Sequence, residues 1–283
     1  MITTLQATIS LFVFIFGMCI GSFLNCVIYR LEQSKSLKGR SFCPHCKHTL
    51  SWKDLFPIFS FLLLRGKCRY CRKNISIQYP LAELATGILF VLIFLSASPN
   101  WPSGLGFWSF ARLCFMFYVS YSMIIIFVYD LKHYLIPDKV LFPAIIITFI
   151  YKFFENLAFS HWDLIRNLKL EIGNSASVLN LVLAVVIASG FFFAIWLVSR
   201  GKWMGFGDVK LAVLMGLLLG LPNVLLALFL AFLFGAIIGV MLMVFDKKNL
   251  KSEIPFGPFL IIGTFIAMLW SPQIINWYFK LFI

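Results

Sequence analysis

The sequence predicts an all-α polytopic membrane protein, and three observations lead to this fold class. Hydrophobic residues make up 61% of the 283 residues and charged residues only 12%, whereas soluble domains carry about 25% charged residues. The apolar residues form long runs, several of which reach the roughly 20 residues that a membrane-spanning helix needs. These runs are apolar throughout and do not alternate as barrel strands do, so we expect helices to cross the bilayer.

About eight segments are apolar enough to form spanning helices. They cover residues 7–29, 79–98, 107–129, 138–154, 178–199, 209–221, 224–245 and 257–279. The segment 209–221 is the shortest of them. The first segment has no Lys or Arg before it and exceeds the apolar part of a signal peptide, so we expect a retained helix.

The loop between the first two spans is strongly basic, which predicts the orientation of the chain. Against Glu32 and Asp54, its basic residues are Arg30, Lys35, Lys38, Arg40, Lys47, Lys53, Arg65, Lys67, Arg69, Arg72 and Lys73. By the positive-inside rule this loop lies in the cytoplasm, and eight spans then put both termini on the outer side. The connections 130–137, 200–208 and 246–256 are cytoplasmic by the same reasoning.

The formal net charge of +13 could indicate a nucleic-acid partner, because a basic patch is the usual footprint of phosphate binding. Here the positive charge gathers in one loop beside the membrane, where attraction to anionic lipid explains it. We therefore expect contact with the lipid bilayer and no nucleic acid. The sequence divides into a first transmembrane helix at 1–29, a cytoplasmic loop domain at 30–78 and a seven-helix core at 79–283.

Two Cys-x-x-Cys pairs lie in the basic loop. Cys43 and Cys46 are separated by 21 residues from Cys68 and Cys71. Two such pairs match the spacing of a structural zinc site, in which four thiolates bind one tetrahedral ion. A reducing cytoplasm disfavours disulfides, and a redox Cys-x-x-Cys normally occurs singly. Four thiolates leave no open position for a substrate, so we expect the zinc to be structural.

The other cysteines and the loop histidines have simpler interpretations. Cys19, Cys26 and Cys114 lie in or beside apolar spans and are expected to be small buried apolar residues. His45 and His48 flank the first cysteine pair and could compete as ligands. Since four thiolates complete the zinc shell, we expect solvated histidines.

A few carboxylates lie where a membrane protein should exclude them, which makes each a candidate functional residue. They are Glu83, Asp130, Asp138 and Asp208. Asp130 ends the third span and Asp208 opens the sixth, so the predicted topology brings both to the cytoplasmic face. A close pair of carboxylates shares one proton, and can deprotonate a water while protonating a carbonyl oxygen or leaving amine. This is the chemistry of an aspartic peptidase.

Helix dipoles offer a purely structural alternative. Acidic residues are favoured in the first turn of a helix, which accounts equally well for Glu83, Asp138 and Asp208. Asp130 lies at the end of a helix, where the dipole disfavours negative charge, so its presence needs another reason. Gly205 and Gly207, just before Asp208, allow a tight turn or a close approach to a neighbouring backbone.

The segment Gly-Phe-Gly-Asp208-Val-Lys210-Leu resembles the GxGD signature of the bacterial type IV prepilin leader peptidases. The similarity extends along nearly the whole chain. It includes the paired cysteines, the Asp130 to Asp138 stretch, Gly21-Ser-Phe-Leu-Asn-Cys-Val-Ile-Tyr-Arg30, Ile75-Ser-Ile-Gln-Tyr-Pro-Leu-Ala-Glu-Leu84 and Ile254-Pro-Phe-Gly-Pro-Phe259.

The resemblance implies a multi-pass enzyme of the bacterial inner membrane that cuts the basic leader from type IV prepilins and pseudopilins, typically between Gly and Phe. It implies Asp130 and Asp208 as the catalytic residues, with Asp138 as second choice to Asp130. It places the active site and zinc loop in the cytoplasm and both termini in the periplasm. It also implies methylation of the new N-terminus by S-adenosylmethionine; the residues that bind this donor stay open, with Arg65-Gly66-Lys67 as the one stretch to consider.

Two other classes of protein remain as alternatives. A proton- or cation-coupled membrane transporter would also carry buried carboxylates, but it predicts inverted repeats or broken helices that the sequence does not show. A non-enzymatic assembly scaffold with a zinc-stabilised loop predicts that Asp130→Asn and Asp208→Asn leave function intact.

Overall fold

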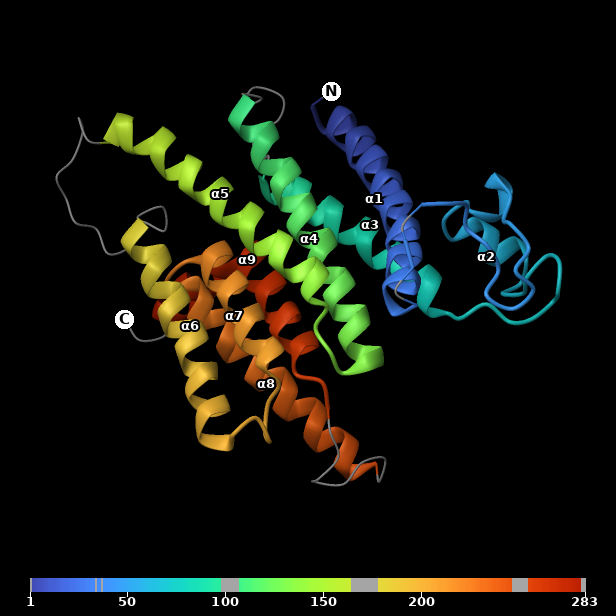
Figure 1. Cartoon of the computed structure of the whole chain (residues 1–283). Coiled ribbons are helices and arrows are strands. Elements are labelled where there is room, and N and C mark those ends of the chain that lie inside the picture. The colour runs from blue at the N-terminus through green and yellow to red at the C-terminus, as the bar shows by residue number, and fades with distance from the viewer. Residues whose placement is uncertain are drawn as a thin grey trace. The chain divides into compact units, whose positions relative to one another are not determined.

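The computed structural model describes residues 2–33, 35–36, 38–97, 107–163, 178–245 and 254–280 (Figure 1). The chain forms two compact units, Met1–Ile125 and Ile126–Ile283, with the boundary inside helix α4. Helices account for all the regular elements of the described residues apart from two isolated bridges. The predicted all-α fold class is therefore confirmed.

The first unit is built on two long helices that pack closely together. Helix α1 (Ile2–Glu32) lies against α3 (Gln78–Ala97), and α4 (Phe107–His133) begins in this unit. A Cβ atom on Gly17 would lie 2.8 Å from the Cα of Gly87, and one on Gly21 would lie 2.7 Å from the Cα of Glu83. Glycine is thus required on α1 because the two backbones approach too closely for a larger side chain.

The segment between α1 and α3 contains little regular structure. It holds a short 3-10 helix, η1 (Trp52–Asp54), and α2 (Phe59–Leu63). Two isolated bridges, Phe42 with Thr49 and Lys67 with Asn74, each close a tight loop around one cysteine pair. The sequence predicts this segment as one loop domain but gives no sign of the two short helices.

In the second unit, the short helix α7 is surrounded by longer ones. Its helices are the end of α4, α5 (Asp138–Asp163), α6 (Val178–Ser199), α7 (Phe206–Leu219), α8 (Asn223–Val244) and α9 (Gly257–Lys280). Helix α7 contacts α5, α6, α8 and α9, and most of its side chains are buried. It is thus held from several sides.

Asn180 of α6 fixes the end of α7. Its Nδ2 donates to the carbonyl of Leu221 at 3.1 Å, and its Oδ1 accepts from the backbone N–H of Leu221 at 2.7 Å. Gly220 ends the helix with a φ of +66°, a conformation that glycine adopts without strain. The two hydrogen bonds satisfy backbone groups that the helix itself cannot pair.

Each of the predicted spans corresponds to a helix, but not every helix meets the requirements for crossing a bilayer. Among the described residues, six helices are long and apolar enough: α1, α3, α4, α6, α8 and α9. Helix α7 has 14 residues. At about 1.5 Å per residue, its length is less than the roughly 30 Å thickness of the hydrocarbon core. Helix α5 carries Lys139, Lys152 and Glu155. A count of eight spans therefore stays a prediction.

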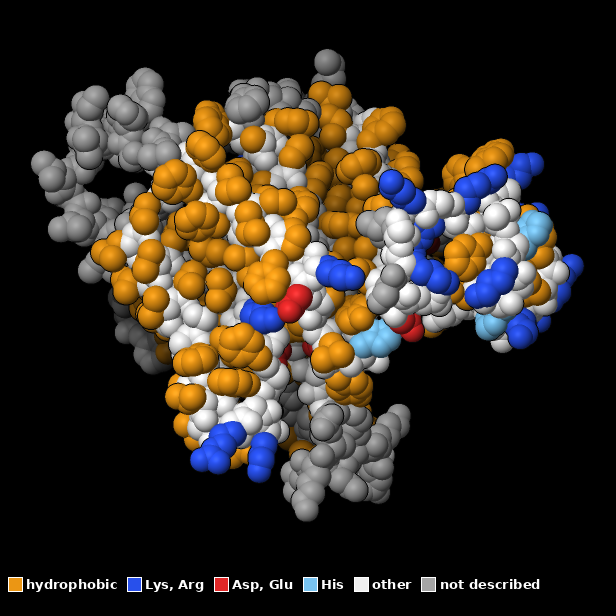
Figure 2. All heavy atoms as spheres, viewed as in Figure 1, with side chains coloured by type: hydrophobic (Ala, Val, Ile, Leu, Met, Phe, Trp, Pro, Cys, Tyr) orange, Lys and Arg blue, Asp and Glu red, His pale blue; other side chains and the backbone are white. Residues whose placement is uncertain are grey.

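Apolar side chains cover much of the outer surface of the helices (Figure 2). Phe12, Phe153, Val186 and Phe229 are among the large exposed ones, which fits helices that face lipid. The prediction of three buried cysteines needs correction: Cys19 and Cys114 are exposed on the helix surface, and Cys26 is only half-buried. Cys19 and Cys114 are thus surface residues of their helices and do not belong to the protein core.

Candidate functional site

Asp130 lies at the end of α4 and is 4% exposed. Its carboxylate accepts a hydrogen bond from the backbone N–H of Gly257, the first residue of α9. A Cβ on Gly257 would lie 2.5 Å from Asp130 Oδ2, so only glycine fits there. Although the dipole of its own helix disfavours Asp130, the N-terminus of α9 offers it positive partial charge.

Asp208 lies in the first turn of α7 and is 9% exposed. Its carboxylate is close enough to Asp130 for the two charges to interact. Ile136 lies close to a glycine beside each aspartate. A Cβ on Gly207 would lie 3.1 Å from Ile136 Cβ, and one on Gly257 would lie 3.6 Å from Ile136 Cδ1. The starts of α7 and α9 thus meet around one side chain, with both carboxylates buried beside them.

Asp138 has a different environment, because it forms an ion pair with Lys210 of α7. The Lys210 Nζ lies 2.8 Å from each carboxylate oxygen of Asp138, whose side chain is 52% exposed. The same ammonium lies over the rings of Phe142 at 5.2 Å and Phe206 at 5.6 Å. Asp138 therefore ties α5 to α7 outside the buried pair.

The four cysteines of the loop come together in the first unit. Their Sγ atoms all lie within 4.8 Å of one another, and those of Cys43 and Cys71 are 3.9 Å apart. Sulfurs about 2.3 Å from a tetrahedral zinc lie roughly 3.8 Å from each other. Cys43, Cys46, Cys68 and Cys71 can therefore hold a zinc ion with little movement, and that ion would supply a structural cross-link.

The two cysteine pairs have the same backbone geometry. The N–H of Cys43 donates to the carbonyl of His48 and that of Cys68 to Lys73, each at 2.9 Å. Lys47 and Arg72, each directly after the second cysteine of its pair, share a φ of 59°. The chain thus forms two equivalent loops, each of which presents two sulfurs to a common centre.

The thiols influence one another's ionisation. Burial would raise the pKa of Cys43, but hydrogen bonds from the backbone of Cys46 and His45 and from neighbouring thiols lower it to about 7. The backbone N–H of Lys73 favours the Cys71 thiolate, but burial and the other sulfurs outweigh it and raise the pKa of Cys71 to about 11. These opposite shifts mean that the four thiols do not all ionise readily by themselves. A bound metal cation would favour the thiolate at every position.

Asp54 joins η1 to the second cysteine pair. Its side chain is 3% exposed, and it accepts hydrogen bonds from Arg69 Nε at 2.7 Å and from Ser51 Oγ at 2.8 Å. Burial alone would raise its pKa, but the hydrogen bonds from Arg69 and Ser51 and the charge of Arg69 hold the pKa below its ordinary value. Both loop histidines, His45 and His48, are exposed as predicted.

Two residues of the carboxylate site were not predicted from the sequence. Gly257 lies in the segment Ile254-Pro-Phe-Gly-Pro-Phe259, which was noted only for its resemblance, and Ile136 lies between Asp130 and Asp138. The Pro residues on either side of Gly257 were the available signal for a helix start. Arg65-Gly66-Lys67 forms a turn, in which Gly66 has a φ of +68°.

Comparison with known families gives two matches. The Type IV leader peptidase family matches residues 117–240, which include both buried aspartates. The Bacterial Peptidase A24 N-terminal domain matches residues 15–97, which include the four clustered cysteines. No solved structure matches the chain.

Several curated proteins are similar over almost their whole length, and they carry the name prepilin leader peptidase/N-methyltransferase. The protein from Aeromonas hydrophila is 30% identical, over 96% of this chain and 94% of its own. The one from Legionella pneumophila is 31% identical, over 93% and 92%. The one from Pseudomonas aeruginosa is 28% identical, over 93% and 91%.

Proposed function

The chain belongs to the Type IV leader peptidase family, and from this premise we propose that it is a membrane aspartic endopeptidase acting on type IV prepilins and pseudopilins. It removes their short basic leader, typically at a Gly-Phe bond. It then methylates the new N-terminus with S-adenosylmethionine. The names of its relatives support both activities.

The observation that carries the peptidase proposal is the buried pair of Asp130 and Asp208. A close carboxylate pair holds one proton, so one oxygen takes a proton from water as that water attacks the peptide carbonyl. The other carboxyl group donates its proton to the carbonyl oxygen or to the leaving amine. Asp138 is not the catalytic partner in this proposal, because Lys210 engages both of its oxygens.

We place the carboxylate pair and the cysteine loop at the cytoplasmic face of the inner membrane, with both termini in the periplasm. The excess of Lys and Arg between α1 and α3 supports this orientation. A prepilin presents an apolar helix in the bilayer and a charged leader on the cytoplasmic side, so its scissile bond lies at the interface. In this proposal the chain has three parts: a first transmembrane helix at 1–29, a zinc-binding loop domain at 30–78 and a peptidase core at 79–283.

Cleavage of a model prepilin by the purified full-length protein tests the assignment. We expect Asp130→Asn and Asp208→Asn each to lower the cleavage rate by about 1,000-fold or more, because each removes half of the acid–base pair. Asp138→Asn is the matched control and should keep most of the activity. Mass spectrometry identifies the cut bond and any added methyl group. Normal cleavage by both pair variants would make the aspartic mechanism wrong.

A further inference from the structure

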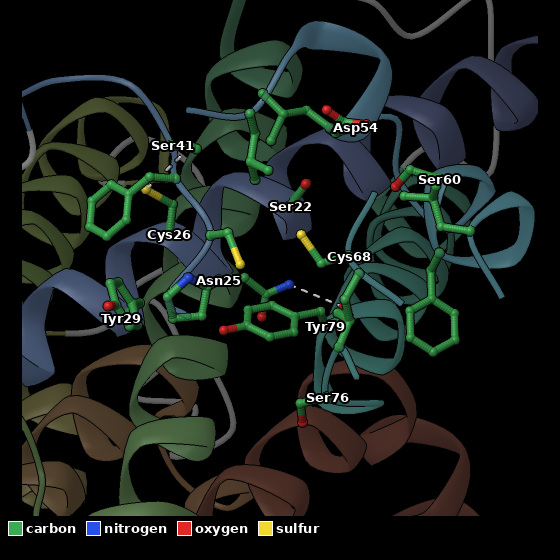
Figure 3. Close-up of a pocket in the computed structure, with 18 of the residues that line it drawn as sticks. Ser22, Asn25, Cys26, Tyr29, Ser41, Asp54, Ser60, Cys68, Ser76 and Tyr79 are labelled. Carbon is green, nitrogen blue, oxygen red and sulfur yellow. Dashed lines mark hydrogen bonds between the residues drawn. The ribbon is translucent and has the colours of Figure 1, made fainter. Parts of the chain in front are cut away.

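A cavity of about 330 Å³ lies within the first unit, between α1, the cysteine segment and the start of α3. We call it the α1–α3 cavity. Its wall includes Asn25, Tyr29, Cys68 and Tyr79, which are labelled in Figure 3, together with Cys43 and Glu83. Its volume is in the range of pockets that bind small organic ligands. All its lining residues belong to Met1–Ile125, whereas Asp130 and Asp208 belong to the second unit.

One wall of the α1–α3 cavity carries a buried acceptor that has no partner among the described residues. Asn25 is 5% exposed, and its Nδ2 donates to the carbonyl of Tyr79 at 3.1 Å (Figure 3). This bond fixes the amide and leaves Asn25 Oδ1 with no hydrogen bond from the described residues. Leaving such a group unpaired costs about 1–3 kcal/mol, so the site is suited to a ligand that donates an N–H or O–H.

The α1–α3 cavity also contains a buried carboxylate. Glu83 is 8% exposed and accepts hydrogen bonds from the backbone N–H of Ile58 at 2.7 Å and from the hydroxyl of Ser22. Among the described residues, no basic side chain forms an ion pair with it. Tyr29 and Tyr79 line the same space. A buried carboxylate in a space with aromatic residues favours a cationic ligand. Arg30 and Arg69 also line the cavity, but Arg30 donates to backbone carbonyls and Arg69 pairs with Asp54.

We infer that the α1–α3 cavity binds S-adenosylmethionine. This inference rests on the proposed N-methyltransferase activity and deepens it, because it assigns the methyl donor to particular residues. The sulfonium and ammonium groups of the donor suit Glu83 and the two tyrosines. An N–H or O–H of its nucleoside supplies the donor that Asn25 Oδ1 lacks, and Lys73, which also lines the cavity, suits its carboxylate. None of Arg65, Gly66 and Lys67 lines the cavity.

Equilibrium binding of radiolabelled S-adenosylmethionine to the full-length protein in detergent tests the inference without depending on turnover. We expect Asn25→Leu and Glu83→Gln each to weaken binding by about 10-fold or more, because each removes a polar partner in a buried site. Asn156→Leu and Glu155→Gln, on α5 in the other unit, are matched controls and should bind like the wild type.

A second measurement uses the wild-type protein only, so it does not depend on the folding of variants. The bound donor is cross-linked by ultraviolet light and the labelled peptides are identified by mass spectrometry. We expect labels at Tyr29 or Tyr79. Labels only outside the cavity, or unchanged binding in both cavity variants, would overturn the assignment.

The outcomes also separate this inference from the proposed function. A wild-type protein that cleaves prepilin but neither binds the donor nor methylates would refute the methyltransferase proposal and the cavity assignment together. Wild-type methylation with unchanged donor binding in the cavity variants would refute the assignment alone. A third outcome is that the cavity variants keep their affinity for the donor and bind a peptide with a free N-terminal Phe more weakly than the wild type does. That result would identify the cavity as the acceptor site and overturn our inference.

Discussion

Gly257 fixes the position of one catalytic candidate by lacking a side chain. Its backbone N–H donates to Asp130, and no Cβ fits between the two residues. The carboxylate therefore lies directly against the first turn of α9. Any group added at Gly257 has to displace either the helix or the carboxylate.

We expect Gly257→Ala to lower prepilin cleavage by about 100-fold, because a displacement of roughly 1 Å at a reacting group has that effect. Initial rates measure the change, and a thermal unfolding curve checks that the protein is folded. Gly239→Ala is the control, since its Cβ would have nothing within 4 Å. Wild-type cleavage by Gly257→Ala would show that contact with α9 does not position Asp130.

Counting spans along the sequence predicted Asp130 and Asp208 at the same membrane face, and in the structure both carboxylates are buried and near enough for their charges to interact. The helix dipole singled out Asp130 over Asp138, eight residues further along, but it could not show what either carboxylate contacts. The difference arises from partners far along the chain. Lys210 neutralises Asp138, whereas Gly257 provides a backbone N–H to Asp130.

At the scale of helices, α7 carries Asp208 and owes its position to close packing. A Cβ on Gly216 would lie 2.7 Å from the Cα of Val185 on α6, so the two backbones are nearly in contact. Asn180, also on α6, forms hydrogen bonds with the backbone of Leu221 just after the end of α7. These contacts lie at the end of α7 opposite Asp208, so they set the height and tilt of the helix.

We expect Gly216→Ala to destabilise the protein by about 1–3 kcal/mol, the usual effect of an extra methyl group in a tightly packed interface. Cleavage should fall as well, because α7 must move away from α6 and carries Asp208 with it. Unfolding at increasing concentrations of a denaturing detergent measures the stability, and initial rates of cleavage measure the activity. Gly190→Ala on α6 is the control, because its Cβ would have open space. Equal stability of both variants would contradict close α6–α7 packing.

The sequence predicts a structural feature well when the pattern that indicates it is local in the chain. The paired cysteines were predicted to share one site because the spacing of Cys43, Cys46, Cys68 and Cys71 is itself the signal. The short helices η1 and α2 were missed, because they are stabilised by tertiary contacts such as Asp54 with Arg69. Helix α7 corresponds to the shortest predicted span: at 14 residues, its position depends on its neighbours more than on its own length.

In the molecule as a whole, the two candidate sites belong to different units. The cysteine cluster and the α1–α3 cavity lie within Met1–Ile125, and the residues around the aspartate pair lie within Ile126–Ile283. Cys43 and Cys68 are members of the cluster and also line the cavity. A zinc ion held by the cluster would therefore bind two residues that also form the wall of the α1–α3 cavity.

We expect the purified protein to contain about one zinc ion per chain, and removal of that ion to affect the two activities unequally. A chelator should weaken binding of S-adenosylmethionine by about 10-fold or more, because two of the four cysteines form part of the cavity wall. Prepilin cleavage should fall less, because every contact described for Asp130 and Asp208 lies in the other unit.

Metal analysis, donor binding and cleavage rates measured on one chelated preparation compare these effects, and zinc is added back to test reversibility. Hydrogen exchange should increase in residues 38–78 and stay low in α7, because only the former depend on the metal for their fold. Cys114→Ser is the control, since Cys114 lies outside the cluster. If the chelated protein bound the donor normally but lost cleavage, the zinc would support the peptidase site, and the connection between the cluster and the α1–α3 cavity would be wrong.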